Sequence, residues 1–267
     1  MKLKGRVALI TGGSRGVGRS VALAFAREGC DVVLVAKTME PDPRLPGTLK
    51  DVAAEVEKLG ARALAVQADL RFEDQIAAAV KQALAGFGKV DILVNNAGAL
   101  FIGPLLETPV KRMDLVHALN ARAPMLFAQA LLPGMIERKW GHIVNMSPPI
   151  RPESAPGKIP YLTSKFGMTL LTYGLAQEVK QHNIAAHSLW PAVVVESAAT
   201  INFGFGDRRN WRKPEVLADA ALALVAREPS SRTGRAWIDE DVLREDGVTD
   251  FSKYAVDPTR EPQKLDW

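Results

Sequence analysis

The sequence Arg6-Val-Ala-Leu-Ile-Thr-Gly-Gly-Ser-Arg-Gly-Val-Gly18 leads from a strand-like apolar run into a glycine-rich turn. Apolar residues follow it at helical spacing, at Val21, Ala24 and Phe25. A strand that passes through spaced glycines into a helix is the context of a dinucleotide-binding loop. In such a loop Gly12 permits the tight turn, Gly16 lets the backbone approach a pyrophosphate, and Gly18 allows close helix packing. The first N–H groups of the helix then face the phosphates.

The rest of the chain alternates strand-like and helix-like segments, which predicts a parallel sheet with helices on both faces. Further strand-like segments are residues 31–36, 63–67, 90–94, 142–146 and 184–189. Helical patterns cover residues 48–60, 72–87, 110–140 with an interruption near Asn120, 161–181, and 214–227. Residues 38–47 contain Pro41, Pro43 and Pro46 and are predicted to form a loop. We therefore expect a single α/β domain over residues 1–267, a Rossmann-type doubly wound parallel sheet of about seven strands.

Composition excludes several classes of protein. The 34 Lys and Arg residues are scattered among 30 Asp and Glu residues without a basic run, so the net charge of +4 does not indicate a nucleic-acid partner. No run approaches the roughly 20 apolar residues of a membrane span. Cys30 is the only cysteine, and the four histidines lack ligand-like spacing, so we expect no disulfide and no metal site. The N-terminus shows no signal peptide, and the cytoplasm is the expected compartment.

Tyr161-Leu-Thr-Ser-Lys165 places a phenol and an ammonium on one face of a predicted helix. A free tyrosine titrates near pH ~10. The lysine cation, helped by the charge of a cofactor, is expected to lower the pKa of the phenol by about three units, at a differential interaction of roughly 4 kcal/mol. Such a tyrosine can exchange a proton with a carbonyl or an alcohol at neutral pH.

Together these motifs resemble the short-chain dehydrogenase/reductase family. The glycine spacing is Gly-x-x-x-Gly-x-Gly, and the other matching motifs, in order, are Asp69, Asn95-Asn-Ala-Gly98, Asn120, Ser147 and Tyr161-x-x-x-Lys165. The resemblance implies that Tyr161 is the general acid/base, that Lys165 lowers its pKa and binds the nicotinamide ribose, and that Ser147 orients the substrate oxygen. It also implies that Asn120 holds a proton-relay water and that Asp69 contacts the adenine ring.

The predicted nicotinamide cofactor is NADP(H). NAD sites place an acid about 20 residues beyond the glycines, where this chain has Ala36, Lys37 and Thr38. Arg15 and Lys37 can meet a 2′-phosphate, although Glu40 and Asp42 in the following loop oppose this. The full set of predicted cofactor contacts is Gly12, Ser14, Arg15, Gly16, Val17, Gly18, Lys37, Asp69, Leu70, Asn96, Ala97, Gly98, Tyr161, Lys165, Pro191 and Val194.

Further details resemble the hydroxysteroid dehydrogenase-like protein 2 subgroup of this family. They are Ala36-Lys-Thr38 before the proline-rich loop, Ser147-Pro-Pro149, Leu189-Trp-Pro191 and the closing residues 233–241. The chain departs from the family after Pro191, where Ala192 replaces a glycine and Glu196 occupies the position of a threonine. That loop normally helps to hold the nicotinamide carboxamide, and Ser197 is the candidate to replace the threonine.

The expected substrate is a small hydrophobic alcohol, aldehyde or ketone. The segments that should line the crevice are mostly apolar, at residues 99–102, 148–150 and 193–195 and at Phe203 and Trp211. A steroid, a terpenoid and a fatty carbonyl all fit. A cofactor-bound regulatory or scaffold protein without turnover is the alternative from another class, and an epimerase or dehydratase is the alternative among enzymes. The family resemblance implies a homodimer or homotetramer.

Overall fold

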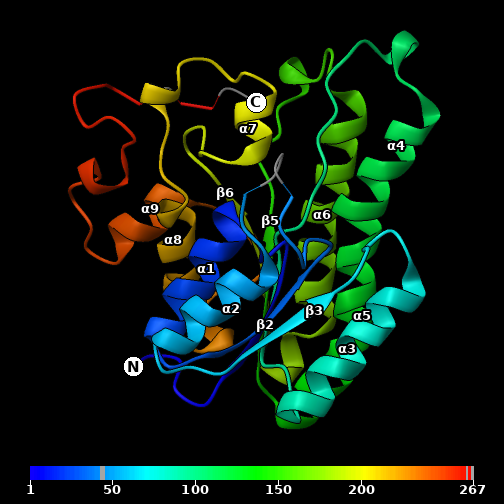
Figure 1. Cartoon of the computed structure of the whole chain (residues 1–267), viewed down its shortest axis with the longest axis vertical. Helices are drawn as coiled ribbons and strands as arrows, with labels where there is room; N and C mark the ends of the chain where they lie inside the picture. Colours follow the sequence, from blue (N-terminus) through cyan, green and yellow to red (C-terminus); the bar gives the residue numbers. More distant parts are fainter. Residues whose placement is uncertain (43–45, 263, 266–267) are drawn as a thin grey trace.

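The computed structural model describes residues 1–42, 46–262 and 264–265, and Pro43 of the predicted loop lies outside them. One parallel sheet forms its centre, in the strand order β3-β2-β1-β4-β5-β6-β7 (Figure 1). The strands are β1 Val7–Thr11, β2 Asp31–Ala36, β3 Ala63–Gln67, β4 Ile92–Asn95, β5 Gly141–Met146, β6 Ile184–Trp190 and β7 Arg235–Ile238. The Rossmann-type sheet of seven strands is thus confirmed.

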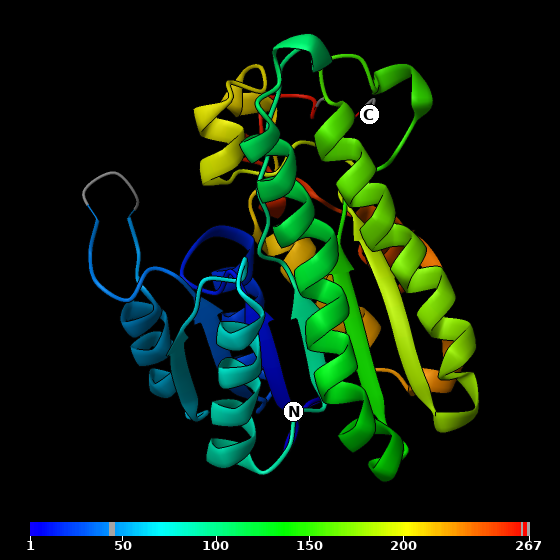
Figure 2. The same cartoon turned by 90° about the vertical axis from the view of Figure 1, so that its right-hand side faces the viewer.

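Helices cover both faces of the sheet (Figures 1 and 2). One face carries α1 Gly16–Arg27, α2 Leu49–Lys58, α8 Glu215–Val225 and α9 Asp239–Glu245. The other carries α3 Glu73–Phe87, α5 Ala123–Arg138 and α6 Ile159–Glu178, with α4 Val110–His117 leading into α5. The short helix α7 Ala198–Asn202 follows β6 beyond the carboxyl edge of the sheet.

Each face of the sheet has its own apolar core. Successive residues of a strand point to opposite faces, so Leu9 packs with Phe127 in one core while Ile10 packs with Phe25 in the other. All of these side chains are fully buried. Burial on both faces explains why β1, β2 and β4 are largely continuous apolar runs without polar alternation.

Local sequence signals predicted most element boundaries to within two or three residues. Thr48 caps α2 as expected: its Oγ1 accepts from Asp51 N at 3.1 Å, and the Asp51 carboxylate accepts from Thr48 N at 3.0 Å. The expected interruption near Asn120 is a π-helical turn, Ala118–Arg122, between α4 and α5. The short elements β7, α7 and α9 were not located from the sequence, because each depends on contacts with distant segments.

Two buried histidines face each other across β5 and β6. His142 Nδ1 lies 3.1 Å from His187 Nε2, and His142 Nε2 lies 3.1 Å from the carbonyl oxygen of Arg227. Burial lowers the pKa of His142 to about 4 and also lowers the pKa of His187, and the positive charges of Arg6 and Arg232 act in the same direction. Both rings are therefore neutral at neutral pH.

Lowering the pH from 7 to 5 is expected to destabilise the fold through this pair. The unfolded chain protonates its histidines near pH ~6.5, whereas folded His142 resists protonation until about pH 4. The contribution of the pair to the free energy of unfolding is complete above pH ~6.5. It falls by about 2 kcal/mol per histidine between pH 7 and 5. Urea unfolding at the two pH values measures the loss.

A matched pair of variants separates this effect from other titrating groups. His187→Gln should flatten the pH dependence relative to the wild type, whereas His182→Gln, in the partly exposed turn after α6, should leave it unchanged. The same pH dependence in the wild type and in His187→Gln would show that the pair does not control acid stability.

Candidate active site

The carboxyl ends of the strands open on a cleft of about 1210 Å³. The cleft lies where the strand order reverses between β1 and β4, the usual ligand site of a doubly wound sheet. Its volume exceeds the roughly 300–1,000 Å³ of a site for one drug-sized ligand. Fourteen of the predicted cofactor residues line it: Gly12, Ser14, Arg15, Gly16, Val17, Lys37, Leu70, Asn96, Ala97, Gly98, Tyr161, Lys165, Pro191 and Val194.

The glycine loop has the backbone geometry that the sequence predicted. Gly12 and Gly16 adopt positive φ angles of 69° and 53°, and a Cβ on Gly16 would meet no atom within 4 Å, so its backbone is open to a ligand. Gly18 lies behind the cleft wall rather than in it. A Cβ there would lie 2.3 Å from Gly12 O and 2.6 Å from Asn96 Nδ2. The cradle fits a dinucleotide pyrophosphate at the start of α1.

Thr11 and Asn96 join this loop to the end of β4. Asn96 Nδ2 donates to Thr11 O at 2.9 Å and to Gly12 O at 3.3 Å. Thr11 Oγ1 accepts from the N–H groups of Asn96 and Ala97, both at 3.0 Å. The sequence analysis did not single out Thr11. Its position directly after the first predicted strand, at the start of the glycine-rich turn, was the signal available.

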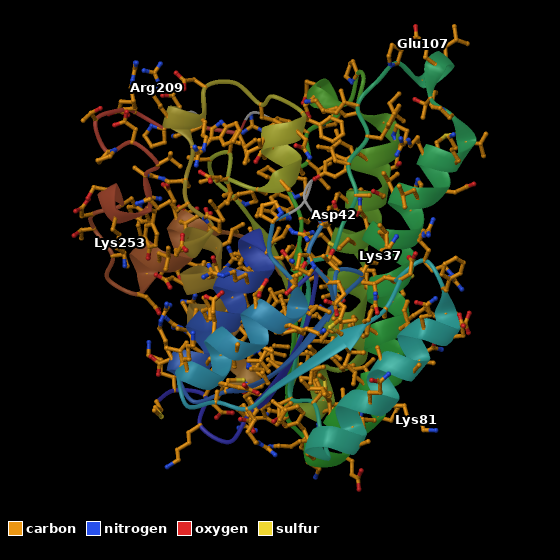
Figure 3. All side chains as sticks on the ribbon, in the orientation of Figure 1. Lys37, Asp42, Lys81, Glu107, Arg209 and Lys253 are labelled. Atoms are coloured by element: carbon orange, nitrogen blue, oxygen red, sulfur yellow. The ribbon has the colours of Figure 1, made fainter. Side chains whose placement is uncertain are left out.

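Charged groups gather where β2 ends, at the predicted adenosine side of the cleft. Lys37 Nζ lies 3.2 Å from the Asp69 carboxylate, which also binds Arg71 Nη2 at 2.6 Å. The bonds to Arg71, with those to Lys37, lower the pKa of Asp69 to about 2. Glu40 and Asp42 line the cleft on the loop that follows, and Figure 3 shows Lys37 and Asp42 at the same end of the sheet.

Asp69 and Arg15 are held by other protein groups in the structure, as Lys37 is. The Asp69 side chain does not line the cleft, although its neighbours Ala68 and Leu70 do. Arg15 lines the cleft and donates to the carbonyl oxygens of Pro46 and Gly47, at 3.0 and 2.9 Å. Arg15 thus holds the second end of the proline-rich loop against the glycine loop.

Tyr161 and Lys165 both line the cleft on α6, one helical turn apart. Lys165 is buried, and its Nζ donates to Met146 O at 2.7 Å and contacts Met168 Sδ at 3.7 Å. Burial lowers the pKa of Lys165 to about 8. Burial also raises the pKa of Tyr161, so in the chain alone the predicted lowering was wrong in direction. The cause is loss of hydration, which disfavours the charged phenolate.

Ser147 and Asn120 lie behind the cleft wall, in contact with α6. Ser147 Oγ donates to Lys165 O and accepts from Thr169 Oγ1, both at 3.2 Å. Asn120 Oδ1 accepts from Ala99 N at 2.9 Å, and its Nδ2 donates to Ala99 O at 2.8 Å. The same Nδ2 donates to Ser164 Oγ at 3.0 Å. Neither residue lines the cleft, so their predicted roles toward substrate and water stay predictions.

The segment after Pro191 passes along the cleft. Val194, Val195 and Ser197 line it, whereas Glu196 pairs with Arg208 at 2.8 Å. Ser197 also caps α7, because its Oγ accepts from Thr200 N at 3.1 Å. Ser197, the candidate to replace the threonine, thus lines the cleft, and Glu196 does not.

Most of the lining residues that the sequence analysis missed lie in helices or at the end of β3, and fewer lie in loops. They are Met39, Gln67, Ala68, Leu119, Ala198, Ala199, Thr200, Phe205, Leu217 and Leu265. Among the described residues no helix is long and apolar enough to cross a membrane. The same part of the chain holds no cluster of three or more His, Cys, Asp or Glu side chains placed to bind a metal ion.

Comparison with known proteins agrees with this geometry. Residues 6–203 match the family model described as short chain dehydrogenase. The chain belongs to the short-chain dehydrogenase/reductase family. Over 260 residues it is 42% identical to hydroxysteroid dehydrogenase-like protein 2 of Danio rerio and 40% identical to that of Homo sapiens. These matches cover 96% of this chain and only 62% of each relative.

Solved structures of similar proteins share the fold over nearly the whole chain. A protein from Xanthomonas campestris is 40% identical, with a TM-score of 0.95 over 100% of this chain and 99% of that one. A short-chain dehydrogenase from Mycobacterium thermoresistibile is 43% identical, with a TM-score of 0.91 over 99% and 95%. A metagenomic short-chain oxidoreductase in complex with NADP is 31% identical, with a TM-score of 0.75 over 89% and 97%.

Gly18→Ala is expected to destabilise the protein by about 1–3 kcal/mol, because the new methyl group overlaps Gly12 O and forces the glycine loop to shift. Gly174→Ala is the matched control on α6, since its Cβ meets no atom within 4 Å. That control should be stabilising by about 0.5–1 kcal/mol, because alanine is a better helix former. Thermal unfolding of both variants checks the prediction. Equal effects would show that Gly18 is not sterically required.

Proposed function

We propose that the protein is an NADP(H)-dependent oxidoreductase that interconverts a hydrophobic alcohol and its aldehyde or ketone. The observation that carries this is that Tyr161 and Lys165 line the same cleft as the glycine loop. A general acid/base beside a dinucleotide cradle is what coupled proton and hydride transfer requires. A cofactor-binding regulatory or scaffold protein without turnover is the alternative, and it gives no reason for the buried lysine beside the tyrosine.

In the proposed mechanism the nicotinamide cofactor, when bound, supplies or accepts the hydride. Tyr161 exchanges the proton at the substrate oxygen through its phenol. Lys165, whose ammonium is buried one turn away, favours the phenolate form. Ser147 stabilises the substrate oxygen when its hydroxyl hydrogen turns from Lys165 O toward the cleft, and Asn120 holds the segment after β4 against α6.

The lining of the cleft supports a hydrophobic substrate. The cleft lining includes the apolar residues Leu100, Val195, Phe205 and Leu265. Apolar walls with a few polar groups are typical of sites for small organic molecules. The curated relatives are named for hydroxysteroids, but the chain spans only 62% of their length. We therefore propose a substrate class and no single compound.

A homodimer or homotetramer is supported by apolar side chains on the outer faces of α5 and α6. Phe166, Leu170 and Met125 are about half exposed. Apolar residues gathered on neighbouring helices are typical of subunit contacts. We further propose that the protein acts in the cytoplasm.

Tyr161→Phe is expected to lower kcat by at least about a hundredfold, because general acid/base catalysis contributes roughly 10²–10⁴-fold. NADPH binding, measured by fluorescence titration, should persist. NADPH oxidation is measured with a panel of hydrophobic aldehydes and ketones. Tyr173→Phe, on the exposed side of the same helix, is the control and should keep full activity. Wild-type protein that binds NADPH and turns over no compound in the panel would favour the regulatory alternative.

Lys37→Ala is expected to weaken NADPH binding by about tenfold and to leave NADH binding nearly unchanged, because only NADPH carries the 2′-phosphate. Lys81→Ala is the control for loss of a surface charge, and Figure 3 shows Lys81 at the opposite end of the sheet from Lys37. Calorimetric titration with both dinucleotides measures the preference. Equal affinities of the wild type for NADH and NADPH would refute the NADP(H) assignment.

A further inference from the structure

Asp239 is a buried carboxylate that the proposed mechanism does not use. It begins α9 directly after β7, and only 1% of its surface is exposed. Its Oδ1 accepts from the backbone N–H of Ala192 at 2.8 Å and from that of Glu240 at 2.7 Å. Ala192 follows Pro191, whose ring lines the cleft. The carboxylate therefore binds the backbone of the cleft wall from behind.

The next residue of α9 holds the other half of the same wall. Glu240 Oε1 accepts from Arg212 Nε at 3.1 Å and Nη2 at 2.8 Å. The backbone of Arg212 in turn pairs with the wall: its N–H donates to Val194 O at 2.9 Å, and its carbonyl accepts from Glu196 N at 2.8 Å. Two adjacent acids at the start of one helix thus anchor residues 192–196.

Both backbone polar groups of Ala192, the N–H and the carbonyl, form hydrogen bonds. Its N–H donates to Asp239, and its carbonyl accepts from Leu265 N at 2.9 Å. Leu265 itself lines the cleft, so the closing segment of the chain is placed through Ala192 as well. A shift of Ala192 would therefore move Pro191, Val194 and Leu265 together.

We propose that Asp239 is a positioning residue for the nicotinamide end of the cleft. Through Ala192 it sets the positions of Pro191 and Val194, which line the same cleft as Tyr161. This inference rests on the proposed function, because it assigns the 191–197 wall to the cofactor's nicotinamide half. Burial raises the pKa of Asp239 to about 7, so the fold keeps this carboxylate out of water although its charged form is disfavoured there.

The test compares a whole dinucleotide with a fragment that lacks the nicotinamide. Calorimetry gives Kd values for NADP+ and for adenosine 2′,5′-bisphosphate in the wild type, Asp239→Ala and Asp239→Asn. Asp241→Asn is the matched control, because it removes the same charge from the same helix at a side chain that is 64% exposed. If the wild type prefers NAD+, the pair of ligands becomes NAD+ and ADP.

Asp239→Ala is expected to weaken NADP+ binding by about tenfold, because it leaves the buried N–H of Ala192 without its acceptor. Fragment binding should stay within about twofold of wild type, the spread between closely similar complexes. Asp239→Asn keeps a neutral oxygen acceptor and should lose only about threefold, since charge-assisted hydrogen bonds are roughly twice as strong as neutral ones. The Asp239→Asn variant also tests the inference if Asp239→Ala does not fold.

Three results would overturn the inference while leaving the proposed function intact. In the first, the binding of NADP+ and of the fragment weakens equally, which would make Asp239 a residue of the fold alone. In the second, the binding of neither ligand weakens. In the third, Asp241→Asn weakens NADP+ binding as much as Asp239→Asn does. A wild type that binds neither ligand pair would overturn the proposed function and this inference with it.

Discussion

The buried ammonium of Lys165 is the constraint around which the site is built. A charge removed from water is costly unless its donors find acceptors, and the pKa of Lys165, lowered to about 8, records that cost. Its bond to Met146 O requires α6 to pass close to the end of β5. The approach then places Ser147 within a hydrogen bond of the Lys165 carbonyl. Gly98 lies beside the same group: a Cβ there would be in ordinary contact with the ammonium, at 3.6 Å, but would clash with Asn120 Oδ1, at 2.8 Å.

The π-helical turn at residues 118–122 also helps to fix the position of α6. Its extra backbone residue turns Asn120 inward, where the side chain bonds Ala99 at the end of β4 and Ser164 on α6. Single π-turns inside α-helices are frequent at functional sites, because they aim one side chain away from the regular helical position. Here that side chain joins the segment after β4, whose Asn96 bonds the glycine loop, to the helix that carries Tyr161. The two halves of the site are thereby held in a fixed relation.

Sequence reasoning succeeded where the signal was local. The glycine loop, the cap at Thr48 and the break near Asn120 each depend on residues within a few positions of one another, and the structure has all three. It failed on the direction of the Tyr161 pKa, because spacing shows that a cation is near but does not show how much water the fold removes. Asp239 is 47 residues from Ala192 and could not be linked to it by pattern.

Fold and site therefore differ in how far the sequence predicts them. Alternating strands and helices with short connections leave few possible topologies, and seven parallel strands in the observed order are among them. The wall of the cleft, by contrast, is assembled from segments distant in sequence, including Phe205, Leu217 and Leu265. Whether a loop residue faces the cleft depends on contacts that no local pattern encodes. Glu196 and Ser197 are adjacent, and only Ser197 lines the cleft.

The proposed preference for NADP(H) over NAD(H) requires a cation that can release its protein partner and bind the 2′-phosphate, and Arg15 and Lys37 are the two candidates. Arg15 is held by two carbonyl oxygens and supports the shape of the loop, so moving it would leave those groups without a donor. Lys37 is different, because its side chain is 63% exposed and its partner Asp69 keeps Arg71 when Lys37 turns away. Exposed ion pairs contribute only about 0–1 kcal/mol, so a phosphate can draw Lys37 from Asp69 at little cost. Under the proposed function, Lys37 is thus the cation expected to distinguish a 2′-phosphate from a hydroxyl, while Glu40 and Asp42, which line the same cleft, act against any anion that enters.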